Sequence, residues 1–359
     1  AHSVADLQDD WRRFTLSADD IALLNPNTGT MATFRSVRDA EITKAIYRRV
    51  PVLIQEEPLV NHWGISFLRM FDMSNDSHLF CTRDELEAQG YVLQGNHFVR
   101  GDERYLPLYE AKLMHQFTHR WATYETDGTT RDMTPDELRD PNALPMPRYW
   151  VDAREVQARR TKLRETFYFS LRRFGRATDE RTLIASIVPP NAFGDNGTLF
   201  AFSDNISPQK MCCLNANLCA FGFDFASRQK VGGVMINQFI VQQLPVIPPH
   251  TYTQDLLDFI VPRVLELTYT AWDLQPFAQD VGYDGPPFVW DEERRFLMRC
   301  ELDALYFHLY QISREDVDYI METFPIVKRK DIAATSDENG EGGEYITKNV
   351  ILEMYDQMA

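Results

Sequence analysis

The chain has 359 residues, of which 44% are apolar and 25% charged, and its formal net charge is −16. This length and composition support two or three substructures with real cores, but the net charge argues against a free-standing nucleic-acid binder, because binding needs phosphate neutralisation. No apolar run reaches the roughly 18 residues of a membrane helix, and the first residues show no signal-peptide pattern, so we expect a cytoplasmic protein with no membrane partner.

The first sixty residues are expected to form a linker and one amphipathic helix. This helix runs from about Ser36 to Arg49 and ends at Pro51. Residues 61–107 are short segments rich in Trp, Phe, Val and Tyr with glycines between them, which is typical of strands and turns. Residues 108–119 look helical, and residues 126–148 form a polar, proline-rich loop.

Basic residues gather in the next segment, which predicts a long helix over 152–173 with its basic side exposed. Residues 154–176 contain only two glutamates but eight basic residues, which are Arg154, Arg159, Arg160, Lys162, Arg164, Arg172, Arg173 and Arg176. The acidic residues are concentrated elsewhere, in 1–20 and 337–344. A basic face on an acidic body is compatible with DNA, and a solvated amphipathic helix explains the same pattern equally well.

The remaining segments predict strands followed by helices. Residues 183–188 and 199–202 indicate strands, 211–225 a buried apolar helix, and 238–244 a strand or an extended exit. The pattern after Pro249 is helical over 253–270, 292–311 and 346–358, with Pro262 as a kink, Asp291 as an N-cap and Ser313 with Asp316 as a capping box. We therefore expect an α+β fold, a mixed region of short strands followed by a helical C-terminal subdomain.

The usual catalytic and metal-binding patterns are weak or missing. His115 and His119 have a metal-compatible spacing on a helix, but Gln116 stands where the metalloprotease pattern has a glutamate, and no third ligand is placed. Residues 191–197 match neither phosphate-loop pattern and indicate a turn, and no G-x-S-x-G elbow occurs. The five cysteines form no C-x-x-C pair and are expected to be buried reduced thiols. The sequence thus predicts no catalytic, cofactor-binding or metal-ligating residue.

The triplet Arg228-Gln229-Lys230, followed by Gly232-Gly233, is a better candidate for recognition. Glycines let the backbone approach a bulky partner closely. Arg and Lys can reach phosphates or guanine, and Gln or Asn can pair with adenine in the major groove. A tight surface turn with solvated charges is the alternative.

Together with several other blocks in a fixed order, this segment resembles the C-terminal target-recognition region of type IIG-like single-chain restriction–modification enzymes. Those enzymes fuse an adenine-N6 DNA methyltransferase to a recognition domain. The blocks that carry the resemblance are SVRDAEITKAIYRRVP (36–51), MFDMSNDSHLF (70–80), YLPLYEAKLMHQFTHRWATY (105–124), RATDERTLIASIVP (176–189), ASRQKVGGVMINQFIVQQLPVIPP (226–249), and CELDALYFHLY (300–310) with EYITKNVILEMYD (344–356).

The resemblance implies a division of labour. In such enzymes a preceding methyltransferase domain binds S-adenosylmethionine and holds the flipped adenine in an Asn-Pro-Pro-Tyr loop, and this chain contains neither segment. We therefore expect residues 1–60 to be a linker and helix from the methyltransferase domain, 61–250 the DNA target-recognition domain, and 251–359 the helical subdomain. The chain departs from the family pattern at Thr118 and Asp179.

The resemblance also implies double-stranded DNA and a methyltransferase catalytic domain as partners, with S-adenosylmethionine used by the parent protein and no cofactor in this chain. The residues expected at the DNA are Arg228, Gln229, Lys230 and Asn237 for bases or backbone, and Lys112, Arg120, Arg172 and Arg173 for phosphates. Two alternatives stay open: a protein-interaction scaffold that docks a catalytic subunit, and an enzyme with an unrecognised metal-dependent nuclease site.

Overall fold

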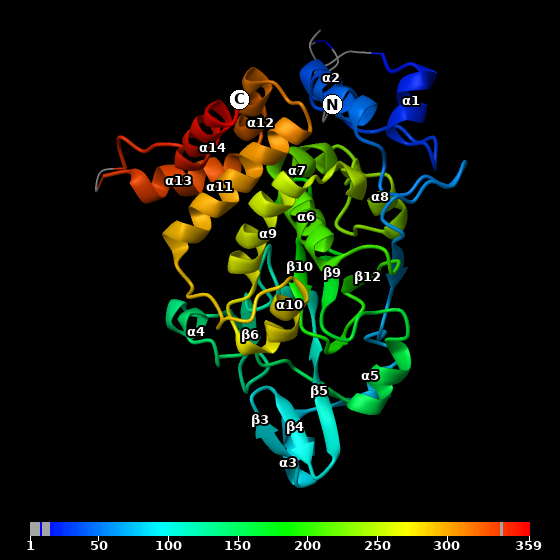
Figure 1. The fold of residues 1–359 in the computed structure, drawn as a ribbon, viewed down its shortest axis with the longest axis vertical. Helices are drawn as coiled ribbons and strands as arrows, with labels where there is room; N and C mark the ends of the chain where they lie inside the picture. The colour runs from blue at the N-terminus through cyan, green and yellow to red at the C-terminus, as the bar shows by residue number, and fades with distance from the viewer. Residues whose placement is uncertain (1–7, 9–14, 338–339) are drawn as a thin grey trace.

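The computed structural model describes residues 8, 15–337 and 340–359. Residues 1–7 and 9–14 of the predicted linker, and 338–339 of the predicted acidic segment, lie outside the described residues. The fold is α+β, as the sequence predicts. Figure 1 shows strands in the middle and at the lower end of the molecule, with the C-terminal helices gathered at the upper end.

A four-stranded antiparallel sheet lies at the centre. Its strands are β1 (Ser66–Leu68), β12 (Gly197–Ala201), β9 (Tyr168–Arg172) and β10 (Ala185–Val188), in that spatial order. Successive side chains of a strand point to opposite faces. Accordingly Phe169 and Ile187 pack into the largest core with the helices, whereas Tyr168 and Val188 pack into a second core on the other face. Both faces of the central sheet are therefore buried.

A second sheet extends from this centre to the lower end of Figure 1. Its order is β2 (Phe80–Cys81), β8 (Trp150–Asp152), β5 (Glu103–Tyr109), β4 (His97–Arg100) and β3 (Val92–Gln94), and β11 (Ala192–Phe193) pairs parallel with β5. A separate hairpin joins β6 (Ala122–Tyr124) to β7 (Thr130–Asp132). The short helices between these strands are η3 (Ser77–Leu79), α3 (Arg83–Ala88), η4 (Ala111–Leu113), α4 (Pro135–Arg139) and α5 (Ala153–Arg159).

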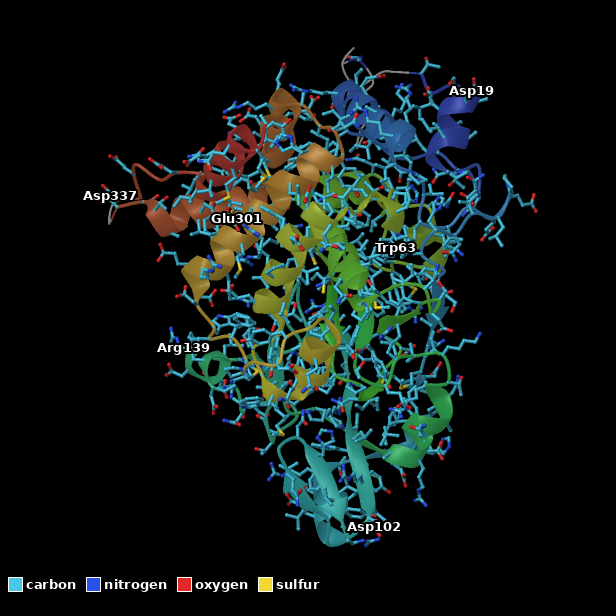
Figure 2. All side chains as sticks on the ribbon, viewed as in Figure 1. Asp19, Trp63, Asp102, Arg139, Glu301 and Asp337 are labelled. Carbon is cyan, nitrogen blue, oxygen red and sulfur yellow. The ribbon has the colours of Figure 1, made fainter. Side chains whose placement is uncertain are left out.

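The helices before and after the strands share one core with the central sheet. The N-terminal pair is α1 (Ala18–Leu24) and α2 (Val37–Arg49). The later helices are α6 (Pro208–Cys219), α7 (Phe221–Arg228), α8 (Gln238–Gln242), η5 (Pro249–Thr251), α9 (Gln254–Thr268), η6 (Trp272–Leu274), α10 (Gln275–Asp280), α11 (Glu292–Leu309), α12 (Arg314–Glu322), α13 (Pro325–Thr335) and α14 (Ile346–Gln357). The largest core runs from Leu24 to Leu352 and so includes residues of all three predicted segments. Trp63, labelled in Figure 2, lies inside it and donates to the carbonyl of Ile247 at 3.1 Å.

Two predicted helices are wrong. Residues 108–119 contain the end of β5 and the short helix η4, because Glu103–Tyr109 pairs with β4, β8 and β11. Residues 152–173 contain α5 and then β9, because the aromatic run Phe167 to Phe169 fits the buried sheet rather than a helix face. The arginines of this segment do not form one basic face: Arg154, Arg159 and Arg160 pair with Asp152, Glu155 and Glu165.

Two further predictions need correction. Residues 211–225 form two helices, α6 and α7, which are separated at Ala220, where ψ is 145°. Residues 238–244 begin as the short helix α8 and become extended only afterwards, where Val52 bridges Pro245. The N-cap predicted at Asp291 is confirmed, since its side chain accepts a backbone N–H at the start of α11. Ser313 accepts the N–H of Asp316 at the start of α12, which is the first half of the predicted capping box. Ser36, where the first predicted helix begins, caps α2 in the same way.

No helix in the described part of the chain is long and apolar enough to span a bilayer. All five cysteines are free, and four of them are buried, as expected; Cys81 is partly exposed.

Candidate nucleic-acid interface

A polar groove opens on the surface between β1, β12 and α8, of which β12 and α8 lie on the right in Figure 1. It is a hollow of about 460 Å³. Its lining is rich in amides and guanidinium groups: Leu68, Arg69, Arg173, Gly197, Thr198, Asn237, Gln238, Phe239 and Gln242. Two residues predicted at the DNA, Arg173 and Asn237, thus lie together in one surface feature.

The two arginines of the polar groove share one carboxylate. Asp195 pairs with the guanidinium of Arg69 and, at 3.4 Å, with that of Arg173. Arg69 also pairs with Asp72, and Arg173 donates to the backbone carbonyl of Asp195 at 2.9 Å. Arg69 keeps 49% of its side chain exposed and Arg173 keeps 23%. Both guanidinium groups are therefore held from one side and open to solvent on the other.

Close packing fixes the loop that presents Asp195. A Cβ on Gly194 would approach the sulfur of Met73 to 2.8 Å, and one on Gly197 would lie 2.2 Å from the ring of Phe193. Asn196, between them, accepts from the backbone N–H of Ala111 at 2.9 Å. The turn predicted over 191–197 is confirmed only for residues 194–197, since Ala192–Phe193 forms β11; this shorter turn positions the carboxylate that pairs with the arginines.

Asn237 lies at the N-terminus of α8 and lines the polar groove. Its side chain does not cap the helix, since α8 has no side-chain cap hydrogen bond. Gln238 and Phe239 are exposed beside it. The amide of Asn237 therefore has its hydrogen-bonding groups available at the groove.

Lys112 and Arg172 line a second hollow of about 400 Å³ with Trp121 and the β6–β7 hairpin. Lys112 is exposed and its amine lies 4.6 Å from the ring centre of Tyr124. Arg172 donates to the carbonyl of Met114, and burial lowers its pKa to about 10. Arg172 is the last residue of β9 and Arg173 follows it, so the end of this strand supplies one arginine to each hollow.

The other four predicted contact residues point into the molecule, and Arg120 does so completely. Its side chain is fully buried. It donates to the carbonyls of Glu137, Leu138, Asp140, Ala143 and Thr270 and to the hydroxyl of Thr270, at 2.7 to 3.2 Å. In this structure Arg120 cannot reach a phosphate, because its donors are committed to the protein interior.

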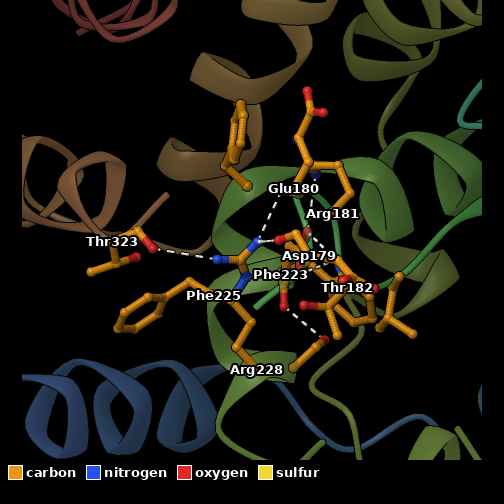
Figure 3. Close-up of polar contacts among 12 residues, drawn as sticks. Asp179, Glu180, Arg181, Thr182, Phe223, Phe225, Arg228 and Thr323 are labelled. Atoms are coloured by element: carbon orange, nitrogen blue, oxygen red, sulfur yellow. Dashed lines mark hydrogen bonds and ion pairs between the residues drawn. The ribbon is translucent and has the colours of Figure 1, made fainter. Parts of the chain in front are cut away.

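Arg228 and Gln229 are interior residues as well. Figure 3 shows the guanidinium of Arg228 between Thr323 and the loop Asp179–Thr182. It donates to the carbonyls of Asp179 at 2.7 Å and Glu180 at 2.9 Å. Its Cζ atom lies 3.9 Å from the ring centre of Phe324. The Gln229 amide donates to the carbonyl of Phe225. Arg228 joins α7 to its neighbours, and the Gln229 amide is buried against its own helix, so the predicted contact of both residues with DNA is not possible in this conformation.

The amine of Lys230 sits in a cage of oxygen atoms. It donates to the carbonyls of Leu24 and Gln243 and to the Asn25 side chain, and it lies 4.5 Å from the ring centre of Tyr47. Burial lowers its pKa to about 7. Lys230 therefore ties the N-terminal segment to the residues after α8 and does not face outward.

Sequence reasoning missed Arg69, Asp195, Thr198, Gln238 and Gln242, all of which belong to the polar groove or hold its arginines. They come from separate parts of the chain, and only the pairing of β1 with β12 and the position of α8 brings them together. A local pattern does not carry that information. One available signal was the charge of Arg69 directly before the block 70–80.

His115 and His119 do not share a helix face. The ring of His115 stacks on Trp121 with centroids 4.4 Å apart, and His119 bonds Asp273 through Nε2 at 2.9 Å. Burial lowers the pKa of His115 to about 3. Within residues 8, 15–337 and 340–359, no three His, Cys, Asp or Glu side chains are arranged to hold a metal ion.

Comparison of the sequence with protein-family models and with curated proteins gives no match.

Proposed function

We propose that this chain is the DNA sequence-recognition part of a restriction–modification adenine-N6 methyltransferase, and that double-stranded DNA lies along the polar groove. One observation carries the proposal: Arg69 and Arg173 share the carboxylate of Asp195 at a surface groove that also presents Asn237 and two glutamines. The sequence blocks that resemble target-recognition regions support it. The parent protein would use S-adenosylmethionine in a methyltransferase domain, in the cytoplasm.

The chemistry of the groove suits the edges of bases. An arginine fork bonds both acceptors of guanine, and Asn or Gln pairs with adenine in the same way. A side chain already held in place by Asp195 loses less conformational entropy when it binds. Lys112, which is exposed next to the end of β9, is suited to a phosphate beside the groove.

The net charge of −16 affects the affinity that the polar groove can have for DNA. An acidic body repels the phosphate backbone, so the isolated chain is expected to bind DNA weakly and only at low salt. The methyltransferase domain would then supply a large share of the affinity, while this chain selects the sequence.

Fluorescence anisotropy with a short mixed-sequence duplex at low salt tests the proposal. We expect Arg69→Ala and Arg173→Ala each to weaken binding about tenfold, because each removes a contact worth about 1–3 kcal/mol. The matched controls are Arg83→Ala and Arg139→Ala, exposed arginines on α3 and α4, away from α8 (Figures 1 and 2). Equal affinity of all four variants, or no binding by the unsubstituted chain, would show the proposal to be wrong.

A further inference from the structure

Four exposed apolar side chains lie in the segments that border the polar groove, where Phe174 pairs with Met235 and Phe239 lines the groove itself. They are Phe174, Val234, Met235 and Phe239, which are 49%, 49%, 41% and 52% exposed. We call them the apolar tip. Singly exposed apolar residues are ordinary on a protein surface, but a group that includes two half-exposed phenylalanines needs an explanation.

A short ladder builds the apolar tip. The N–H of Gly175 donates to the carbonyl of Val234 at 3.1 Å, and that of Ile236 donates to the carbonyl of Arg173 at 2.7 Å. These bonds flank Phe174 and Met235, which bridge each other directly. In such a pair the two side chains stand close together on one face.

The ladder is closely packed at Gly175 and open to solvent at Gly232 and Gly233. A Cβ on Gly175 would lie 2.2 Å from the carbonyl oxygen of Thr182, so the ladder packs directly on the chain below it. Gly232 and Gly233, just before Val234, have no neighbouring atom within 4 Å of the place where a Cβ would stand. The apolar tip is therefore a fixed projection with free space beside it.

Polar and basic groups surround the apolar tip on the groove side. Arg173 precedes Phe174 in the chain, and its Nη2 lies 3.7 Å from the sulfur of Met235. Phe239 itself lines the polar groove together with Arg69 and Arg173. Whatever contacts the tip must therefore combine an apolar surface with groups that accept hydrogen bonds from guanidinium donors.

The size of the apolar tip argues against a protein partner. Aromatic side chains carry about 150–250 Å² each, so the two half-exposed phenylalanines offer roughly 200 Å² together, and Val234 and Met235 add less than that. A standard protein interface needs about 800 Å² on each partner. Stacked nucleobases fit better, because their faces are flat and apolar, their edges carry hydrogen-bond acceptors, and the neighbouring phosphates are anionic.

We propose that the apolar tip inserts between bases of the DNA in the polar groove and holds them unstacked. This inference rests on the proposed function. Apolar side chains such as Phe and Met act as wedges between base steps in other DNA-binding proteins. The cost of opening a stack is lowest where the bases are already mispaired, so a wedge of this kind favours mismatched over perfectly paired DNA.

The test measures the affinity of the chain for two labelled duplexes that differ only in one central mismatch. We expect the mismatched duplex to bind on the order of tenfold tighter, as aromatic stacking on one base would give. The double variant Phe174→Ala/Met235→Ala, which leaves the lining of the polar groove unchanged, should lose this preference while binding the perfect duplex within about twofold of the unsubstituted chain. A 2-aminopurine placed beside the mismatch should brighten with the unsubstituted chain and not with the variant.

Controls separate this inference from the proposed function. Leu59→Ala and Val289→Ala remove apolar side chains that are 76% and 77% exposed elsewhere, and both should keep the preference. Binding without any preference, or a preference that survives the double variant, overturns the wedge and leaves the proposed function standing. Failure to bind either duplex overturns both. Concentration-dependent self-association that the double variant abolishes would assign the apolar tip to a protein contact and overturn the wedge.

Discussion

Arg120 joins three separate segments of the chain through one guanidinium group. Its acceptors lie in and after α4, at residues 137 to 143, and at Thr270 between α9 and η6. Each of these carbonyls would be left without that donor if the side chain were removed. A buried acceptor without a partner costs free energy, so this arginine belongs to the stability of the fold.

We therefore expect Arg120→Ala to lower the free energy of unfolding by at least about 3 kcal/mol, because several buried acceptors lose a charged donor at once. Urea denaturation followed by circular dichroism measures the change. Arg139→Ala, which removes a guanidinium that is 55% exposed and paired with an exposed aspartate, is the control and should change stability by less than about 0.5 kcal/mol. A small effect of Arg120→Ala would mean that its carbonyl acceptors find other donors.

The chemistry of single residues could be predicted from the sequence, but their exposure could not. Arg173 and Arg228 both lie within four residues of a phenylalanine and of a glycine, and no local pattern separates them. Arg228 is buried because the loop Asp179–Thr182, α7 and the end of α12 meet around it. This burial depends on contacts between residues that are far apart in the sequence. Arg69 could not be identified from the sequence for the same reason, because the carboxylate that pairs with it, Asp195, is 126 residues away.

The break between α6 and α7 depends on a carboxylate from another element. Asp303 of α11 accepts the backbone N–H of Phe221, the first residue of α7, at 2.6 Å. It is buried, and burial raises the pKa of its carboxyl to about 6. Its negative charge suits the positive end of α7, but the charge must be kept in a poorly hydrated place.

This pKa predicts a pH dependence. Because the folded pKa lies above the unfolded value of about 3.9, the folded state binds the proton more tightly, so the contribution of Asp303 to stability is largest below about pH 4 and is lost as the pH rises through 6. Relative to Asp303→Asn, which keeps the acceptor for Phe221, the free energy of unfolding should fall by about 2–3 kcal/mol over this window and stay level above pH 7. Urea midpoints of both proteins at each pH measure the difference. A difference that is flat or rises with pH would contradict the assignment.

Elements with local signals were predictable, and elements defined by their partners were not. The caps of α11 and α12 each depend on a few neighbouring residues, so they could be predicted from the sequence. The strand β9 lies in a segment whose basic residues have the spacing expected of the polar face of a helix. It forms a strand because it pairs with β10 and β12. Residues 238–244 show the reverse case, in which a segment predicted as a strand or an extended exit begins as the short helix α8.

Hydrogen bonds and packing join the two sides of the boundary predicted at residue 250. Tyr306 donates to the carbonyl of Cys213 at 2.6 Å, and Tyr310 donates to that of Pro245 at 2.8 Å. Asn217 in turn donates to the hydroxyl of Tyr310 at 2.7 Å. All of these side chains are buried in the largest core. The C-terminal helices therefore complete the core that the central sheet begins.

We expect the chain to unfold in one cooperative transition, because neither side of residue 250 can bury its apolar surface alone. Near-ultraviolet and far-ultraviolet circular dichroism should give the same midpoint in urea. In addition, a chain ending at residue 250 should be unfolded or aggregated when expressed. Two separate transitions, or a stable folded fragment 1–250, would show that the helical segment is an independent domain.

The shared carboxylate of Asp195 has a consequence for the evolution of DNA specificity. If Arg69 and Arg173 read bases, a substitution of either one also changes the position and the local charge of the other, because both guanidinium groups pair with the carboxylate of Asp195. New specificities would then arise through joint changes at three positions and not through single steps. A double-mutant cycle between Arg69 and Arg173 on DNA affinity would reveal this dependence as non-additive free energies.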